Sequence, residues 1–255
     1  MSLLLIGLII GFFAGFICGF FGMGGGSLMV PAIYHFFGST FPVESRMKIS
    51  IGTSLLVIIF SSISAIITYF KNRKIKSNLI LLIVPSGIIG SQIGAFLTSR
   101  LKDLTVKYIF VFLITFLGLR MFFAQENKEN EISNTNSYNK LYGILIGFFS
   151  GFVSGLCGVG GAVLIIPLLY LFLKIPIHYA IGTALIAILF NSISGSIAYI
   201  LRDLVNIKIG LLLALTSVIG APLGAKISIK LPRKKLRKSF SIILILLGVS
   251  VLFRR

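Results

Sequence analysis

The sequence predicts an all-α polytopic membrane protein built from two inverted-topology repeats with Gly-rich broken helices. Three observations lead to this class: an apolar composition, a series of long uncharged segments and an internal duplication. The 255 residues are 56% hydrophobic and only 12% charged, with a mean hydropathy of +1.04. Because a soluble domain of this length needs far more polar surface, we predict a multi-pass protein of the cell membrane.

Apolar segments follow one another along the chain. Most approach the roughly 20 residues needed to cross about 30 Å of hydrocarbon. No Lys or Arg precedes Arg46, so the first segment lacks the basic start of a cleaved signal peptide and is expected to belong to the mature fold. The predicted segments are 3–22, 25–38, 48–70, 78–99 and 104–123, followed by 141–158, 160–174, 178–201, 207–229 and 236–253.

An internal duplication divides these segments into two sets of five. Residues 15–34 match residues 151–170 at nine of twenty positions, and residues 51–69 match residues 181–199 at eleven of nineteen. Such self-similarity is the mark of a repeated structural unit. Since five crossings is an odd number, the second copy is expected to enter the membrane upside down, as in many secondary transporters.

The duplication also sets the predicted domain organisation. Residues 1–123 form the first transmembrane repeat, and residues 141–255 form the second. The stretch 124–140 between them is long and polar, and it is predicted to be a linker.

Positive charge is gathered in short clusters between the apolar segments. The net charge is +18, and the main clusters are 71–76, 100–107 and 230–238. Clusters of this kind set membrane topology and contact anionic headgroups, so the expected partner is the lipid bilayer and no nucleic acid is expected. Placing the N-terminus outside puts clusters 71–76 and 230–238 in the cytoplasm, which is the orientation we predict.

Each repeat carries a glycine-rich break, 15-GFICGFFGMGGGSLMVP-31 and 151-GFVSGLCGVGGAVLIIP-167. In hydrocarbon, an irregular glycine turn is tolerated only where it is buried in protein or lines a wet cavity. Short, glycine-interrupted segments at matching positions of two repeats are typical of a transporter's binding site. The other glycines step by four and three, as helix-packing glycines do, and these are Gly15, Gly19, Gly22, Gly151, Gly155 and Gly158.

The breaks predict an anion site. A helix that begins near Gly25 presents free N–H groups and a partial positive charge, and glycine lets a ligand approach the backbone. Two such N-termini, one from each repeat, would converge near the membrane midplane and hold a small anionic substrate without a buried Lys or Arg. The candidate substrate-binding residues of the breaks are Gly24, Gly25, Gly26, Ser27, Gly160 and Gly161.

Hydroxyl and amide side chains in a repeated Gly-Thr block form a second group of candidates. They either line a substrate path with hydrogen-bond donors or only bond to carbonyls of their own helix. The candidate substrate-binding residues of this group are Thr53, Ser54, Thr183, Asn191 and Ser192.

The segments lack the residues of other kinds of site. Asp103 and Asp203 lie at segment ends, so the sequence offers no central carboxylate for proton or Na⁺ coupling. Nothing indicates a catalytic residue, a metal site or a cofactor, and an enzyme is not expected. Cys18 and Cys157 are interpreted as small buried apolar residues or, alternatively, as a thiol relay for sulfur chemistry.

With these motifs the chain resembles the TauE/SafE family of membrane permeases, often called sulfite exporters. The likeness rests on G-x-x-x-G-x-x-G-x-G-G, which ends at Pro31 in the first copy and at Pro167 in the second, and on the Gly-Thr blocks at 52–54 and 182–184. It covers the chain apart from linker 124–140. The resemblance implies a permease for sulfite, organosulfonates or related sulfur anions.

Two rival functions stay open at this point. A passive anion channel could use the same helix ends, and an importer of thiosulfate-type anions would use Cys18 or Cys157. The breaks are also unequal, since the second has Ala162 and Val163 where the first has a Gly-Ser pair. A second copy of the chain is a further candidate partner, in a homo-oligomer.

Overall fold

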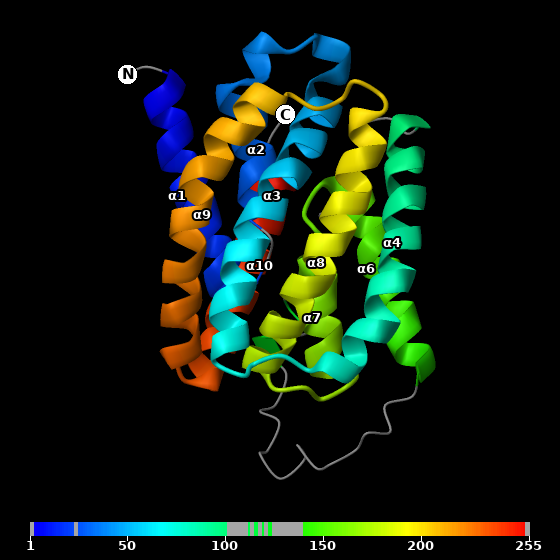
Figure 1. The fold of residues 1–255 in the computed structure, drawn as a ribbon, viewed down its shortest axis with the longest axis vertical. Coiled ribbons are helices and arrows are strands. Elements are labelled where there is room, and N and C mark those ends of the chain that lie inside the picture. The colour runs from blue at the N-terminus through cyan, green and yellow to red at the C-terminus, as the bar shows by residue number, and fades with distance from the viewer. Residues whose placement is uncertain are drawn as a thin grey trace.

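The computed structural model describes residues 3–22, 25–100, 112, 115, 116, 119, 122, 123 and 140–252, and the regular structure in them is helical (Figure 1). The long helices are α1 (Leu3–Phe21), α3 (Arg46–Lys71), α4 (Ser77–Arg100), α6 (Lys140–Cys157), α8 (Ile177–Ile200), α9 (Ile207–Lys230) and α10 (Arg233–Leu252). The short ones are α2 (Gly26–Phe36) and α7 (Ala162–Leu171), with single turns η1 (Gly38–Thr40) and η2 (Val43–Ser45).

Helix length confirms the multi-pass class. Within the described residues, six helices are long and apolar enough to cross a membrane, namely α1, α3, α4, α6, α8 and α9. Helices α2 and α7 have 11 and 10 residues, so each spans about 15 Å, roughly half the hydrocarbon thickness. Both follow a glycine break, as predicted.

Two sequence-based boundaries fall partly outside these residues. Most of the predicted span 104–123 and residues 124–139 of the predicted linker lie outside what the structure describes. Lys140, assigned to the linker from the sequence, is instead the first residue of α6.

The two repeats interlock. Helix α1 of the first repeat lies along α9 of the second, and α4 of the first lies along α6 of the second. Small residues make both contacts close: a Cβ atom on Gly15 would lie 2.5 Å from the Ser217 Cα, and one on Gly151 would lie 2.7 Å from the Gly87 Cα. Ser217 and Gly87 occupy the same position in the two repeats. Each repeat therefore packs its first helix on the fourth helix of the other.

Helices α3 and α8 cross the centre of the bundle in opposite directions (Figure 1). A Cβ atom on Gly52 would lie 2.9 Å from the Tyr199 Cβ, and one on Gly182 would lie 3.1 Å from a ring carbon of Tyr69. Gly52 matches Gly182 in the repeat, and Tyr69 matches Tyr199, so the two contacts are reciprocal. Reciprocal contacts are what a two-fold relation between copies produces, and this arrangement is compatible with the predicted inverted repeat.

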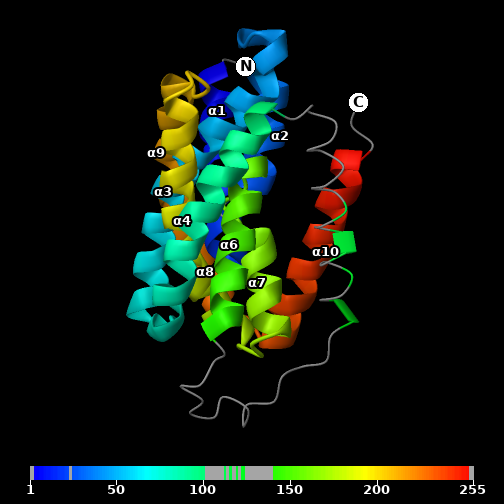
Figure 2. The same ribbon diagram turned by 90° about the vertical axis from the view of Figure 1, so that its right-hand side faces the viewer.

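Two of the six glycines predicted to pack helices together lie in the breaks instead. Gly15, Gly19, Gly151 and Gly155 lie in the close helix contacts, as their spacing predicts. Gly22 and Gly158, which share that spacing, instead have left-handed backbones with φ of 66° and 70°. They follow the last residues of α1 and α6, so they belong to the breaks. The first half of α10 lies closer to the other helices than its second half does (Figure 2). There the Phe240 ring lies 5.9 Å from that of Phe21.

Candidate functional site at the glycine breaks

The two glycine breaks meet inside the protein. A Cβ atom on Gly26, the first residue of α2, would collide with the Gly158 carbonyl oxygen and lie 2.6 Å from the Val159 Cα. Gly26, Gly158 and Val159 are all buried. The start of α2 therefore touches the break that precedes α7, which brings the N-terminal ends of the two half-length helices together.

Both half-length helices begin in the same way. Gly25 precedes α2 with φ of 71°, and Gly161 precedes α7 with φ of 80°, a left-handed conformation that glycine adopts at little cost. Neither helix has a side-chain cap hydrogen bond at this position. The first-turn N–H groups of a helix have no acceptor within the helix. Two buried helix N-termini without side-chain caps form an electropositive environment suited to an anion.

Polar side chains without partners lie beside the second break. Asn191 is fully buried, its Nδ2 lies 3.3 Å from the Cβ position of Gly161, and neither amide atom has a hydrogen-bond partner. Ser192 is also fully buried and unpartnered, and its Oγ lies 3.4 Å from the Cβ position of Gly160. A buried polar group left without a partner costs about 1–3 kcal/mol. A ligand at the start of α7 could supply the missing partners.

Neighbouring helices fix the position of Asn191. The Ser91 hydroxyl of α4 donates to the Asn191 backbone carbonyl at 2.8 Å. Gly195, one turn later on α8, leaves room for this hydroxyl, because a Cβ atom there would lie 2.9 Å from the Ser91 Oγ. Gly87 of α4 lies against the Asn191 Oδ1. The amide is thus held between α4 and α7, near the middle of α8.

In the first repeat, the described residues at the matching positions are not unpartnered. Ser61 and Ser62 occupy the positions of Asn191 and Ser192 in the first repeat. The Ser61 hydroxyl donates to the Ile58 carbonyl at 3.2 Å, and the Ser62 hydroxyl donates to the same carbonyl at 2.6 Å. Both are satisfied within their own helix, which is the alternative that the sequence left open for such residues.

Two further polar residues differ between the two repeats, and neither was a candidate from the sequence. Ser154 on α6 and Ser196 on α8 are buried and have no hydrogen-bond partner for their hydroxyl groups. Their counterparts in the first repeat are Cys18 and Ile66. Cys18 lies beside the first break, with its Cβ 3.5 Å from the Cβ position of Gly25. Comparing the repeats position by position for polar residues present in one copy alone would have found Ser154 and Ser196.

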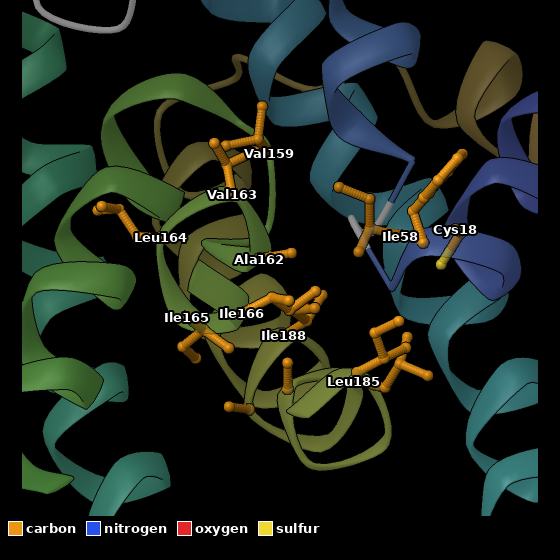
Figure 3. Packing of buried hydrophobic residues seen from close by; sticks show 14 of the residues in the cluster. Cys18, Ile58, Val159, Ala162, Val163, Leu164, Ile165, Ile166, Leu185 and Ile188 are labelled. Carbon is orange, nitrogen blue, oxygen red and sulfur yellow. The ribbon is translucent and has the colours of Figure 1, made fainter. Parts of the chain in front are cut away.

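Apolar side chains surround the remaining part of the junction. A Cβ atom on Gly160 would lie 2.7 Å from Ile188 and 3.5 Å from Ile58. Figure 3 shows the start of α7 at Ala162 facing Ile58 of α3 and Cys18 of α1. Ala162, Ile58 and Ile188 are all buried. Such surroundings keep the local dielectric low and strengthen the field of the helix ends.

The remaining candidates have structural partners. Ser54 donates to the Gly158 carbonyl at 2.8 Å, so it holds the second break in place. Thr53 accepts the backbone N–H of Asn206, and Thr183 accepts that of Lys76. These threonines hold the loops before α9 and α4, so the structure does not gather them with Asn191. Gly24 and the side chain of Ser27 lie outside what the structure describes.

Charged side chains stay away from the junction. Among the buried side chains that the structure describes, none is Lys, Arg, Asp or Glu. Cys18 and Cys157 are both buried, at 0% and 7% exposed. Within the described residues, no group of three or more His, Cys, Asp and Glu side chains could hold a metal ion. Any anion bound here would be held by backbone and neutral side chains.

Known proteins were compared with the chain as a whole. The family described as sulfite exporter TauE/SafE matches residues 7–251. The chain is 31% identical to "Probable membrane transporter protein YunE" of Bacillus subtilis, over 91% of this chain and 91% of that protein. It is 31% identical to "Probable membrane transporter protein MJ0441" of Methanocaldococcus jannaschii, over 91% and 89%. No solved structure was found to match.

Proposed function

Because this chain belongs to the sulfite exporter TauE/SafE family of membrane transporters, we propose that it transports a small oxyanion, sulfite or an organosulfonate, across the cell membrane. The substrate would bind at the start of α7, where the second glycine break meets the first. The two relatives are named only as membrane transporters, so the choice of sulfite follows the description of the family, and the geometry of this junction supports an anion.

The observation that carries the proposal is the unpartnered amide of Asn191 beside Gly161. Asn191 is 0% exposed, yet its donor and its acceptor both lack a hydrogen bond. The α7 N-terminus next to it also lacks a side-chain cap. An oxyanion satisfies both at once, since its oxygens accept hydrogen bonds from the Asn191 Nδ2, the Ser192 hydroxyl and backbone N–H groups.

The position of this site suits a transporter. Asn191 lies near the middle of α8, a helix that spans Ile177–Ile200, so a bound anion would lie near the membrane midplane. The half-length helices begin there and run toward opposite ends of the bundle (Figure 1). Binding at the junction of the two repeats lets movement of one repeat against the other open the site to either side.

Binding to purified protein in lipid nanodiscs tests the proposal. We expect Asn191→Ala to weaken sulfite and methanesulfonate binding roughly tenfold or more, which corresponds to about 1.4 kcal/mol for the lost hydrogen bonds. Ser61→Ala is the matched control, because its hydroxyl bonds only to its own helix, and it should change affinity less than about twofold. Unchanged binding to Asn191→Ala would show that the anion does not use this site.

A transport assay separates the carrier from the channel alternative. Vesicles preloaded with unlabelled substrate should show saturable counterflow of labelled substrate, because a carrier exposes one binding site alternately to the two sides and exchanges internal for external substrate. Anion currents of single-channel size, without counterflow, would instead support a passive channel.

A further inference from the structure

The proposed site offers an anion only neutral hydrogen-bond donors. Asn191 and Ser192 lie beside the second break, and their side chains have no hydrogen-bond partner. No Lys or Arg occurs among the buried side chains that the structure describes. Among the described residues, the positive potential at the junction therefore comes from helix ends and not from a buried cation.

That potential is small, and an upper limit for it can be estimated from the helix ends. One helix N-terminus is equivalent to roughly +0.5 of an elementary charge. The α2 N-terminus touches the break before α7 through Gly26 and Gly158, so two such ends lie near one another. Together they amount to at most about one positive charge, because α1 and α6 end at the same breaks with partial negative charge. This can balance one negative charge and leaves a second without compensation.

We infer that the site selects a singly charged oxyanion group, such as a sulfonate or hydrogen sulfite, over a doubly charged one such as sulfate. This inference rests on the proposed function and specifies the charge class of its substrate. The cost of removing an ion from water rises with the square of its charge, whereas the attraction to fixed dipoles rises only in proportion to it. A site without a buried cation therefore penalises the second charge.

Cationic side chains at the ends of the bundle do not provide this selection. Lys74 and Lys76 lie beside the Tyr179 ring, 5.0 and 5.7 Å from its centroid, at the end where α4 begins. Arg100 and Arg202 lie 4.9 and 5.9 Å from the Phe96 ring at the other end. Such clusters attract anions of either charge to both faces of the protein. Discrimination by charge must then occur at the junction.

Two anions of permanent charge and comparable size test the inference: methanesulfonate with one charge and sulfate with two. Binding to wild-type protein in nanodiscs would be measured by calorimetry at constant ionic strength, since screening affects the two differently. We expect methanesulfonate to bind at least about tenfold tighter than sulfate. Asn191→Ala should weaken the binding of both anions and keep their ratio of affinities, because the helix ends that set the charge preference are unchanged, and Ser61→Ala should change neither.

The outcomes separate the inference from the proposed function. Sulfate binding as tightly as methanesulfonate, with both weakened by Asn191→Ala, would overturn the charge selection and leave the anion site standing. A preference for methanesulfonate in wild-type protein, with the affinities of both anions unchanged in Asn191→Ala, would place the selection elsewhere and overturn the inference. If methanesulfonate, sulfite and sulfate all failed to bind wild-type protein, the proposed function would fall and the inference with it.

Discussion

The hydroxyl of Thr53 accepts a hydrogen bond from the backbone N–H of Asn206 at 2.9 Å. Thr53 belongs to α3 of the first repeat, and Asn206 caps α9 of the second by accepting the Ile209 N–H. The second repeat returns the contact, because Thr183 accepts the backbone N–H of Lys76, just before α4, at 3.0 Å. Each repeat thus fixes the loop that starts the fourth helix of the other.

Removing this hydroxyl should destabilise the fold without altering the site. Thr53→Val and Thr183→Val keep the side-chain shape but leave a partly buried N–H without its acceptor, so each should lower the free energy of unfolding by about 1 kcal/mol. Thermal unfolding of protein in detergent measures this. Ser50→Ala is the control, because the Ser50 hydroxyl bonds only to the Arg46 carbonyl of its own helix. Equal losses in Thr53→Val and Ser50→Ala would argue against the loop-holding role.

The membrane orientation gives a second prediction. Arg73 follows α3 and Asp203 follows α8, at matching positions of two helices that run in opposite directions, and both residues are exposed. The cluster at 71–76 should face the cytoplasm, since positive charge is retained there. An impermeant thiol reagent applied outside intact cells should label Asp203→Cys and not Arg73→Cys. Labelling of both from the same side would rule out the inverted arrangement.

The close helix contacts give a third prediction. Gly15→Ala and Gly151→Ala insert a methyl group against the backbones of Ser217 and Gly87, and overpacking of this kind costs about 1–3 kcal/mol. Both variants should unfold at lower temperature, while the folded fraction binds anion with an affinity close to that of wild type. A large loss of affinity at normal stability would mean that these glycines act at the site.

Much of this architecture could be predicted from the sequence because it depends on short stretches of neighbouring residues. Hydrophobic length gives the spans, and runs of glycine give the breaks before α2 and α7. The packing of α1 on α9 and of α4 on α6 could not be predicted, since it depends on which small-residue surfaces, far apart in the sequence, come into contact. For the same reason, the sequence does not show that Thr53 holds a loop, because its partner, Asn206, lies in the other repeat.

The position of the two breaks could be predicted from the sequence, but their backbone conformation and their neighbours could not. The glycines mark the junction, yet Gly25 and Gly161 have left-handed backbones, and a Cβ atom at either would meet a carbonyl of the preceding helix, that of Ala14 or Ser150. A side chain there disturbs the fold as well as any ligand, so these positions cannot separate binding from folding. Asn191 can, because its amide has no structural partner to lose.

The cysteines provide a fourth prediction, directed at the sulfur-relay alternative. Cys18 is 0% exposed, and Cys157 is 7% exposed at the end of α6. Reactive cysteines lie in partly exposed, electropositive surroundings, whereas buried ones are inert. Cys18→Ser combined with Cys157→Ser should therefore transport sulfite at a rate within about twofold of wild type after correction for expression. Complete loss of transport at normal expression would instead support the thiol relay.

The last prediction is that one substitution at Asn191 raises stability and abolishes binding. Leu has the same branching as Asn, with two methyl groups in place of the amide oxygen and nitrogen, so Asn191→Leu removes a buried amide whose donor and acceptor are both unpartnered. It should raise the free energy of unfolding of the ligand-free protein by about 1–2 kcal/mol. Anion at 100 times its Kd should stabilise wild type by about 2.7 kcal/mol and leave Asn191→Leu unchanged.

Thermal unfolding with and without methanesulfonate measures both effects in one experiment. Ser61→Ala, at the matching position of the first repeat, should lack the gain in stability and should keep the response to the anion, since its hydroxyl is already bonded to Ile58. A residue that only supports the core loses stability when it is replaced. A gain in stability together with a loss of binding is instead the behaviour of a binding residue, whose unmet hydrogen bonds are kept for the ligand. If Asn191→Leu proved less stable than wild type, the amide would have a structural role and the site would have to be placed elsewhere.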